Sequence, residues 1–331
     1  MALKNIVGQE KAAGILFGIL GNQKIATSYL FCGEPGIGKK TAAVQFAKAL
    51  NCKNSPIGSR QPAVGHEPEP GLFDACDMCD SCIKIDNGVH PDFLFISPEE
   101  RQIRIEEIRA IEDALSFKPF EGRKKVVIVD GADMMNLPAA NAFLKTLEEP
   151  PEESVLILIS AKPDFLPATI SSRCSRINFA PLSTESCKTV LADKVPKEGL
   201  DLVTRLSMGR PGAAFSADLL EERAWFLDLL KGMLNADKDG WTSREDMERW
   251  FEYALVLLRD MAVLKITGDT SKLVNIDLGE YLAGLSKSLD VKVIINVHGE
   301  LNQLKGLLFF NLNKSITWNY TASLLRKEIA F

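Results

Sequence analysis

The chain has 331 residues, of which 46% are hydrophobic and 25% are charged. This length allows two or three domains with a large core, and the composition is ordinary for a water-soluble protein. The net charge of −5 argues against a protein that coats nucleic acid by charge alone. No signal peptide precedes Val7 and no apolar run reaches membrane-spanning length, so a cytoplasmic protein is expected.

The N-terminal region predicts a lead-in helix followed by a strand. Apolar residues recur at helical spacing within residues 3–24, and Gly21 marks the end of the helix. The next apolar run leads into a glycine-rich turn. Together they form the stretch from Tyr29 to Thr41, which has the sequence YLFCGEPGIGKKT. The first 180 residues are best explained around this stretch.

The turn has the pattern of a phosphate-binding loop. Gly33, Gly36 and Gly38 allow consecutive backbone N–H groups to point at phosphate oxygens. A helix expected over 39–50 adds the positive end of its dipole, and Lys39 supplies an ammonium for the β- and γ-phosphates. The alternative that composition leaves open is a glycine-rich strand-to-helix turn that binds nothing.

The loop departs from the pattern at one position. The residue after the lysine should be Ser or Thr, because its hydroxyl ligates Mg²⁺, and here it is Lys40. One step along a helix turns a side chain by about 100°, so the hydroxyl of Thr41 is expected to point away from the metal position. The loop therefore predicts phosphate binding without ordinary Mg²⁺ chemistry.

Four of the seven cysteines have the spacing of a metal site. Cys52 precedes a polar stretch rich in Gly and Pro, and Cys76, Cys79 and Cys82 follow it two residues apart. Four thiolates can hold a tetrahedral Zn²⁺, and since they fill every position the metal would be structural and not catalytic. The insertion is predicted over 52–82. The alternative is a set of unrelated free thiols.

Strands and helices alternate through the next hundred residues, which predicts an α/β fold with a mostly parallel sheet covered on both faces. The predicted strands are 93–96, 126–130, 155–159 and 177–179, and the predicted helices are 104–117 and 136–149. Asp130 ends an apolar strand, the place where triphosphatases hold an aspartate beside Mg²⁺. The next residue is Gly131, so the carboxylate that should polarise the attacking water is absent.

Two smaller features in this region have structural interpretations. His90 alone is expected to be a turn or packing residue and not a ligand. The basic turn 122–125 is interpreted as a solvated lead into a strand, in preference to a nucleic-acid contact.

The C-terminal part predicts helices only. They are expected over 182–191, 199–208, 219–234, 243–265, 278–288, 291–310 and 316–327. The cluster 209–212 (GRPG) is expected to break the chain between the second and third of these. An apolar stripe along 243–265 that includes Trp250 predicts core or subunit contact.

With these residues in view, the whole chain resembles the clamp-loader branch of the AAA+ ATPases. The resemblance is carried by six motifs: VGQE at Val7, the loop at Gly33, the four-cysteine module, HPD at His90, NAFLKTLEEPP from Asn141, and SRC at Ser172. It implies an AAA+ (P-loop) nucleotide-binding module over 1–180, a small helical lid over 181–215, and an all-α collar over 216–331 that joins other subunits into a ring.

The resemblance also assigns roles to residues. Arg173, in the SRC motif, would be an arginine finger donated in trans to ATP held by a neighbouring subunit; without the resemblance it would be a surface or helix-cap arginine. The implied nucleotide-site residues are Gly33, Gly36, Gly38, Lys39, Thr41 and Asp130, and the implied zinc ligands are Cys52, Cys76, Cys79 and Cys82.

The chain differs from an active motor of that family at several positions. It has Lys40 and Gly131 at the chemical step, and Ser160 where a first sensor is usually Thr or Asn. Arg210 comes two residues before Gly212, near which the γ-phosphate sensor should lie. These departures favour a non-motor subunit without competent ATPase activity. Whether its loop still binds ATP or ADP is left open.

The expected partners are the motor subunits (gamma or tau), the clamp-opening delta subunit, and, through the assembly, the sliding clamp and primed DNA. The chain itself has no recognisable grouping of acids for a polymerase site. Two alternatives remain. One is an active gamma- or tau-like motor, and the other is a zinc-stabilised AAA+ adaptor outside replication.

Overall fold

A computed structural model describes residues 2–57, 73–100, 102–216, 218–235, 240–310 and 312–328. The chain divides into two compact units. The first comprises Met1–Val190 and Gly209–Gly212, and the second comprises Leu191–Met208 and Ala213–Phe331. Residues 58–72 of the predicted insertion lie outside the described residues. The division into nucleotide-binding module, lid and collar stays a prediction.

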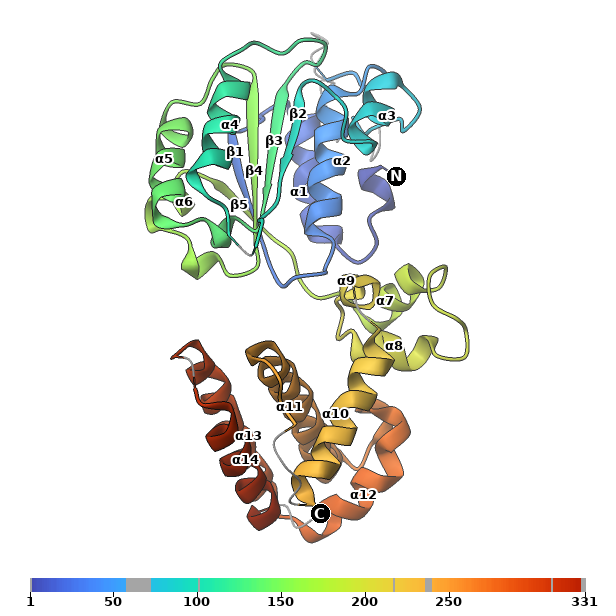
Figure 1. Cartoon of the computed structure of the whole chain (residues 1–331). Helices are drawn as coiled ribbons and strands as arrows, with labels where there is room; N and C mark the ends of the chain where they lie inside the picture. Colours follow the sequence, from blue (N-terminus) through green and yellow to red (C-terminus); the bar gives the residue numbers. More distant parts are fainter. Residues whose placement is uncertain are drawn as a thin grey trace. The chain divides into compact units, whose positions relative to one another are not determined.

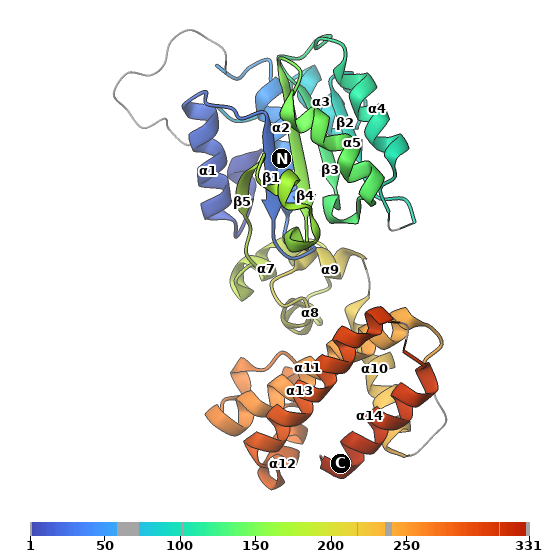
Figure 2. The same cartoon turned by 90° about the vertical axis from the view of Figure 1, so that its left-hand side faces the viewer.

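A parallel sheet forms the centre of the first unit (Figures 1 and 2). Its five strands have the order β2-β3-β4-β1-β5, and every neighbouring pair is parallel. The strands are β1 (Ser28–Cys32), β2 (Phe93–Ile96), β3 (Lys125–Asp130), β4 (Ser154–Ser160) and β5 (Ser175–Asn178). Because β1 and β4 are buried along their whole length, they consist mainly of apolar residues. The predicted α/β fold with a mostly parallel sheet is confirmed.

Helices cover both faces of the sheet, as Figure 1 shows, with one group of helices on each side of the strands. One face packs against α1 (Glu10–Gly21) and α2 (Lys39–Asn51), and the other against α4 (Ile105–Leu115), α5 (Leu137–Glu148) and α6 (Ala168–Ser171). Alternation along β1 shows the two sides. The ring of Tyr29 meets Phe46 of α2 edge-on, with centroids 5.4 Å apart, while Leu30 joins the core beneath α4 and α5.

Several short elements were not predicted, or were predicted differently. The other elements that precede residue 219 are short: η1 (Leu3–Asn5), α3 (Asp80–Asp86), η2 (Ala132–Met134), η3 (Pro163–Phe165), α7 (Thr184–Leu191), α8 (Leu200–Leu206) and α9 (Pro211–Ser216). The expectation that 209–212 only breaks the chain is wrong for its second half. Pro211 begins α9, because proline is tolerated in the first turn of a helix, where its missing N–H has no intrahelical partner.

The HPD motif fixes the turn that leads into β3. Asp92 is fully buried, and its carboxylate accepts hydrogen bonds from the backbone N–H groups of Phe120, Glu121 and Gly122 at 2.7 to 2.9 Å. The Nδ1 atom of buried His90 in turn accepts the Asp92 N–H at 3.1 Å. His90 is therefore a turn residue, as predicted, and the motif has a structural explanation in this chain.

Among the described residues of the second unit, the regular secondary structure is helical, with turns and irregular segments between the helices. Its longer helices are α10 (Leu219–Leu234), α11 (Arg244–Thr267), α12 (Gly279–Ser288), α13 (Val291–Leu307) and α14 (Lys314–Glu328), with η4 (Thr270–Lys272), η5 (Ile276–Leu278) and η6 (Leu308–Phe310) between them. The stripe on α11 belongs to the core. Trp250 is fully buried and lies near Trp241 and Phe251, with ring centroids 5.5 Å from each.

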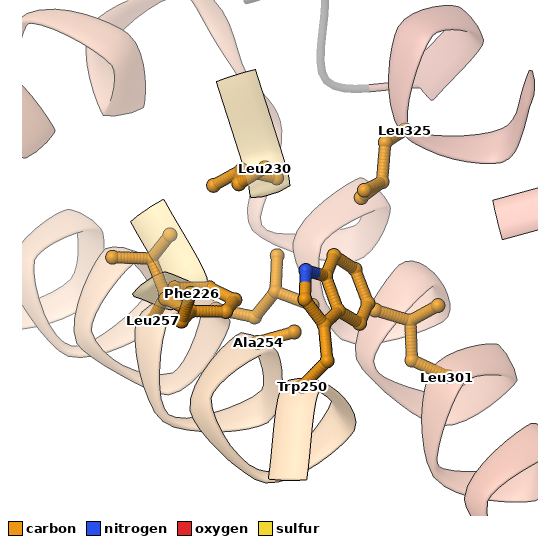
Figure 3. A pocket seen from close by; sticks show the side chains of 8 residues that line it. Phe226, Leu230, Trp250, Ala254, Leu257, Leu301 and Leu325 are labelled. Atoms are coloured by element: carbon orange, nitrogen blue, oxygen red, sulfur yellow. The ribbon is translucent and has the colours of Figure 1, made fainter. Parts of the chain in front are cut away.

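Figure 3 shows a gap in this core, between α10, α11, α13 and α14. It is lined by apolar side chains, among them Phe226, Ala254 and Leu301. Its volume is about 10 Å³, roughly the space of one water molecule. The gap belongs to the packing of the core and has no room for a ligand.

Among the described helices, none combines the length and the apolar character needed to cross a lipid bilayer.

Asp92→Asn should destabilise the first unit by about 1 to 3 kcal/mol at neutral pH, because the neutral amide at this buried position is a weaker acceptor for the three backbone N–H groups. Burial alone would raise the pKa of Asp92, but the three N–H groups outweigh it and hold the pKa below its usual value. The stabilisation is therefore present above the unfolded pKa of about 3.9 and is lost as the pH falls through the folded pKa. Urea unfolding at several pH values measures this.

The matched control is Asp113→Asn, which makes the same change at an exposed position of α4. It should shift the urea midpoint little at any pH. A destabilisation by Asp92→Asn that is as large at pH 3 as at pH 7 would contradict the role given to its charge.

Candidate nucleotide and metal sites

The loop between β1 and α2 has the backbone that a phosphate-binding loop needs. Gly33, Gly36 and Gly38 have φ values of 146°, 77° and 98°, where a side chain is strained. A Cβ on Gly33 would also lie 2.6 Å from the carbonyl oxygen of Phe179. The loop opens directly onto the N-terminus of α2, so its N–H groups and the helix dipole favour an anion at the same place.

Lys39 lies against this loop. Its Nζ donates to the carbonyl oxygens of Gly33 and Glu34, both at 2.6 Å, and only 5% of the residue is exposed. Burial lowers the pKa of Lys39, although the carboxylates of Asp130 and Asp133 oppose the shift. The ammonium is thus held where phosphate oxygens can exchange with the two carbonyl oxygens.

The end of β3 provides one carboxylate, that of Asp130, and its backbone disfavours a second acidic residue at position 131. Asp130 is the last residue of the strand, and burial raises its pKa while Lys40 and Lys39 oppose the rise. Gly131 follows with φ of 70°, and a Cβ there would lie 3.3 Å from the ring of Pro98. A glutamate at this position would be strained by the left-handed backbone as well as crowded.

The residues next to Lys39 do not fit a Mg²⁺ site. Lys40 extends its ammonium over the ring of Phe95, 4.1 Å from the centroid, and offers no oxygen to a metal. Thr41 is exposed. The nucleotide roles predicted for Thr41 and for the other loop residues stay predictions.

The side chain of Arg173 forms its hydrogen bonds with residues outside the glycine loop. It follows α6, is exposed, and donates from Nη1 to the carbonyl of Thr169 at 2.8 Å and from Nη2 to Oε1 of Glu148 at 2.6 Å. Neither of these side-chain hydrogen bonds involves the loop. The guanidinium is held on the surface by two neighbouring helices.

The four predicted zinc ligands do come together. The sulfur atoms of Cys52, Cys76, Cys79 and Cys82 all lie within 4.8 Å of one another. Tetrahedral zinc with Zn–S bonds of about 2.3 Å places its sulfurs about 3.8 Å apart, so the group fits the ion with small adjustments. Burial opposes ionisation of Cys76, but N–H groups of Met78 and Cys79 outweigh it and lower its pKa to about 6. Burial raises the pKa of Cys82.

Comparison with known proteins assigns the chain to a protein family. A family model described as "DNA polymerase III, delta subunit" matches residues 8–183, over half of the chain. The delta' subunit of DNA polymerase III from Pseudomonas aeruginosa is 33% identical over 249 residues, which are 72% of this chain and 70% of that protein. The chain belongs to the clamp-loader family of DNA polymerase III subunits.

Other members of the family match to different extents. The tau subunit of Bacillus subtilis is 31% identical over 91% of this chain and 46% of its own length, and the delta' subunit of the same organism is 32% identical over 56% and 52%. The chain thus spans about half the length of these two relatives. A gamma subunit-related protein from Thermotoga maritima matches 95% of this chain at 18% identity, with a TM-score of 0.43.

Two polar contacts of this clamp-loader chain that close the loop were not predicted. Gln9, in the VGQE motif, donates from Nε2 to the carbonyls of Ile37 and Ala180 at 3.0 and 2.7 Å. Gly212 donates its N–H to the carbonyl of Gly36 at 2.9 Å, and a Cβ on it would lie 2.6 Å from the Gly36 Cα. The VGQE motif was the only available signal for Gln9, and it indicated no more than a helix start.

A buried lysine that was also missed joins α2 to the cysteine module. The side chain of Lys48 is fully buried, and its Nζ lies 2.5 Å from Asp77 and 2.6 Å from Asp86. Asp77 is between two of the predicted zinc ligands, Cys76 and Cys79, and Asp86 ends α3. Burial alone would lower the pKa of Lys48, but the two carboxylates outweigh it and raise the pKa.

Purified chain should contain about one zinc per molecule, because four thiolates fill one tetrahedral site. Metal analysis measures the content, and titration with a thiol reagent should show four cysteines that react only after a chelator is added. Cys82→Ser should lose the metal, whereas Cys174→Ser, outside the cluster, should keep it. Equal reactivity of all seven cysteines without chelator would support free thiols instead.

Lys48→Met should lower the free energy of unfolding by about 1 to 3 kcal/mol and speed the transfer of zinc to a chelator, because it leaves two carboxylates facing an apolar side chain. The matched control is Lys53→Met, which removes an exposed pair with Asp80 at 3.5 Å and should cost less than about 1 kcal/mol. Equal effects of the two substitutions would contradict the stabilising role given to the buried Lys48 and its two carboxylate partners.

Proposed function

We propose that this chain is the non-motor, delta'-like subunit of a bacterial DNA polymerase III clamp loader. It gives Arg173 to ATP bound by a neighbouring motor subunit, without turning over a nucleotide of its own, and so helps to load the sliding clamp on primed DNA. The observation that carries the proposal is the contrast between an exposed, ordered Arg173 and a nucleotide site without hydrolytic groups.

The chain's own site supports the absence of turnover. Hydrolysis in this class of site needs a bound Mg²⁺ and a group that orients the attacking water. Lys40 provides no metal ligand, and the backbone at Gly131 disfavours the glutamate that would orient water. The two losses affect different parts of the same reaction, so restoring one of them would not restore turnover.

Arg173 supports the donation in trans. A guanidinium is planar and permanently charged, and it can bind two oxygens of a triphosphate at once. In this chain it already binds a carboxylate, Glu148, at 2.6 Å. The pair is exposed on both sides, so solvent screens it and a triphosphate can replace Glu148 at small cost.

The partners of the proposed subunit are the gamma or tau motors and the clamp-opening delta subunit, with the collar helices joining them. The cysteine cluster would hold a structural zinc. A working motor is the second candidate, because the B. subtilis tau subunit matches 91% of this chain. The two candidates differ in whether the isolated chain hydrolyses ATP.

Arg173→Ala should reduce DNA-stimulated ATP hydrolysis by the reconstituted clamp loader while leaving its assembly intact. At the one site that receives the finger the loss should be about 10³-fold or more, the range for arginine fingers in triphosphatases. Steady-state ATPase assays and size-exclusion chromatography of the same complexes measure both properties.

Arg176→Ala is the control, since Arg176 is an exposed arginine on neighbouring β5. It should leave turnover unchanged. Unchanged turnover with Arg173→Ala would remove the proposed role of that residue. Clear ATP hydrolysis by the isolated chain with Mg²⁺ would favour the motor.

A further inference from the structure

The ammonium of Lys40 lies on the sheet face where a P-loop protein would carry its metal. Phe95 of β2 pairs in register with Ile128 of β3, and Asp130 is two residues further along β3. Residues two apart on a strand share a face and are separated by about 6.6 Å. The Nζ of Lys40 is 4.1 Å from the centroid of the Phe95 ring, so it lies over the sheet face that also carries Asp130.

Charge around Asp130 is already balanced by the protein. Burial raises the pKa of its carboxyl, and the positive charges of Lys40 and Lys39 oppose this rise. Two ammonium groups therefore act on the one carboxylate that would face a metal. A divalent cation placed there would be repelled by both and would find no hydroxyl from position 40.

The same arrangement suits an anion. The three glycines at φ of 77° to 146° present the loop backbone, the α2 N-terminus adds partial positive charge, and Lys39 is buried at the loop with exchangeable carbonyl partners. The Lys40 ammonium lies over the aromatic face of Phe95, an interaction that a phosphate oxygen can replace. Two lysines can then do what one lysine and Mg²⁺ do in an ordinary loop.

We infer that the loop binds the polyphosphate of a nucleoside di- or triphosphate without a divalent cation, with the ammonium of Lys40 in the place of Mg²⁺. The bound nucleotide is held and not hydrolysed. This inference concerns the chain's own loop and does not depend on Arg173, so either proposal can fail without the other.

The test is calorimetric titration of the purified full chain with ADP and with ATP, each in Mg²⁺ and in EDTA. Wild type should bind with dissociation constants that agree within about threefold between the two conditions. Lys40→Thr should bind about tenfold more weakly in EDTA and recover when Mg²⁺ is added, because threonine restores the metal ligand. Lys40→Met should be weaker in both conditions.

Lys145→Thr, which removes an exposed lysine of α5, is the charge-matched control and should bind like wild type. Thermal melting of each variant checks that it folds. Wild-type binding that weakens about tenfold or more in EDTA would overturn the inference. So would equal affinities of wild type, Lys40→Thr and Lys40→Met in EDTA, or no binding of either nucleotide at millimolar concentration.

Discussion

The burial of α2 against the parallel sheet is the constraint on which the first unit depends. Ten of its 13 residues are buried, and the helix carries a different function at each end. Its N-terminus follows the glycine loop for which phosphate binding is predicted. Near its C-terminus, Lys48 binds two carboxylates of the cysteine module, and Asn51 accepts hydrogen bonds from the N–H groups of Arg123 and Lys124. A shift of α2 would therefore disturb the loop, the cysteine module and the turn before β3 together.

This shared support holds the glycine loop in place without help from a metal or a bound ligand. Lys39 and the three glycines belong to the loop itself. Gln9 and Gly212, from two distant parts of the chain, donate hydrogen bonds to the backbone carbonyls of Ile37 and Gly36. None of these contacts needs a metal or a water-activating group. The residues Lys40 and Gly131 are therefore compatible with the same loop backbone, because none of these contacts involves either residue.

In the proposed subunit, Arg173 and Lys39 have different roles and different surroundings. Arg173 follows the short helix α6 and is exposed, so that a neighbouring subunit could reach its guanidinium, while Lys39 is almost fully buried. An exposed ion pair costs little to exchange, whereas a buried one is expensive to break. A surface arginine held by Glu148 is thus ordered enough to have a defined position and free enough to be donated.

Local patterns in the sequence determined the strands, most helices, the parallel α/β class, the glycine loop and the cysteine spacing. They could do so because apolar periodicity, glycine conformations and ligand spacing act over a few residues. Only the tertiary structure decided how Asp92 binds the N–H groups 28 to 30 residues away, how Lys48 is buried, and that Gly131 has a left-handed backbone. These depend on which distant segments meet when the core is buried, and no local pattern specifies that.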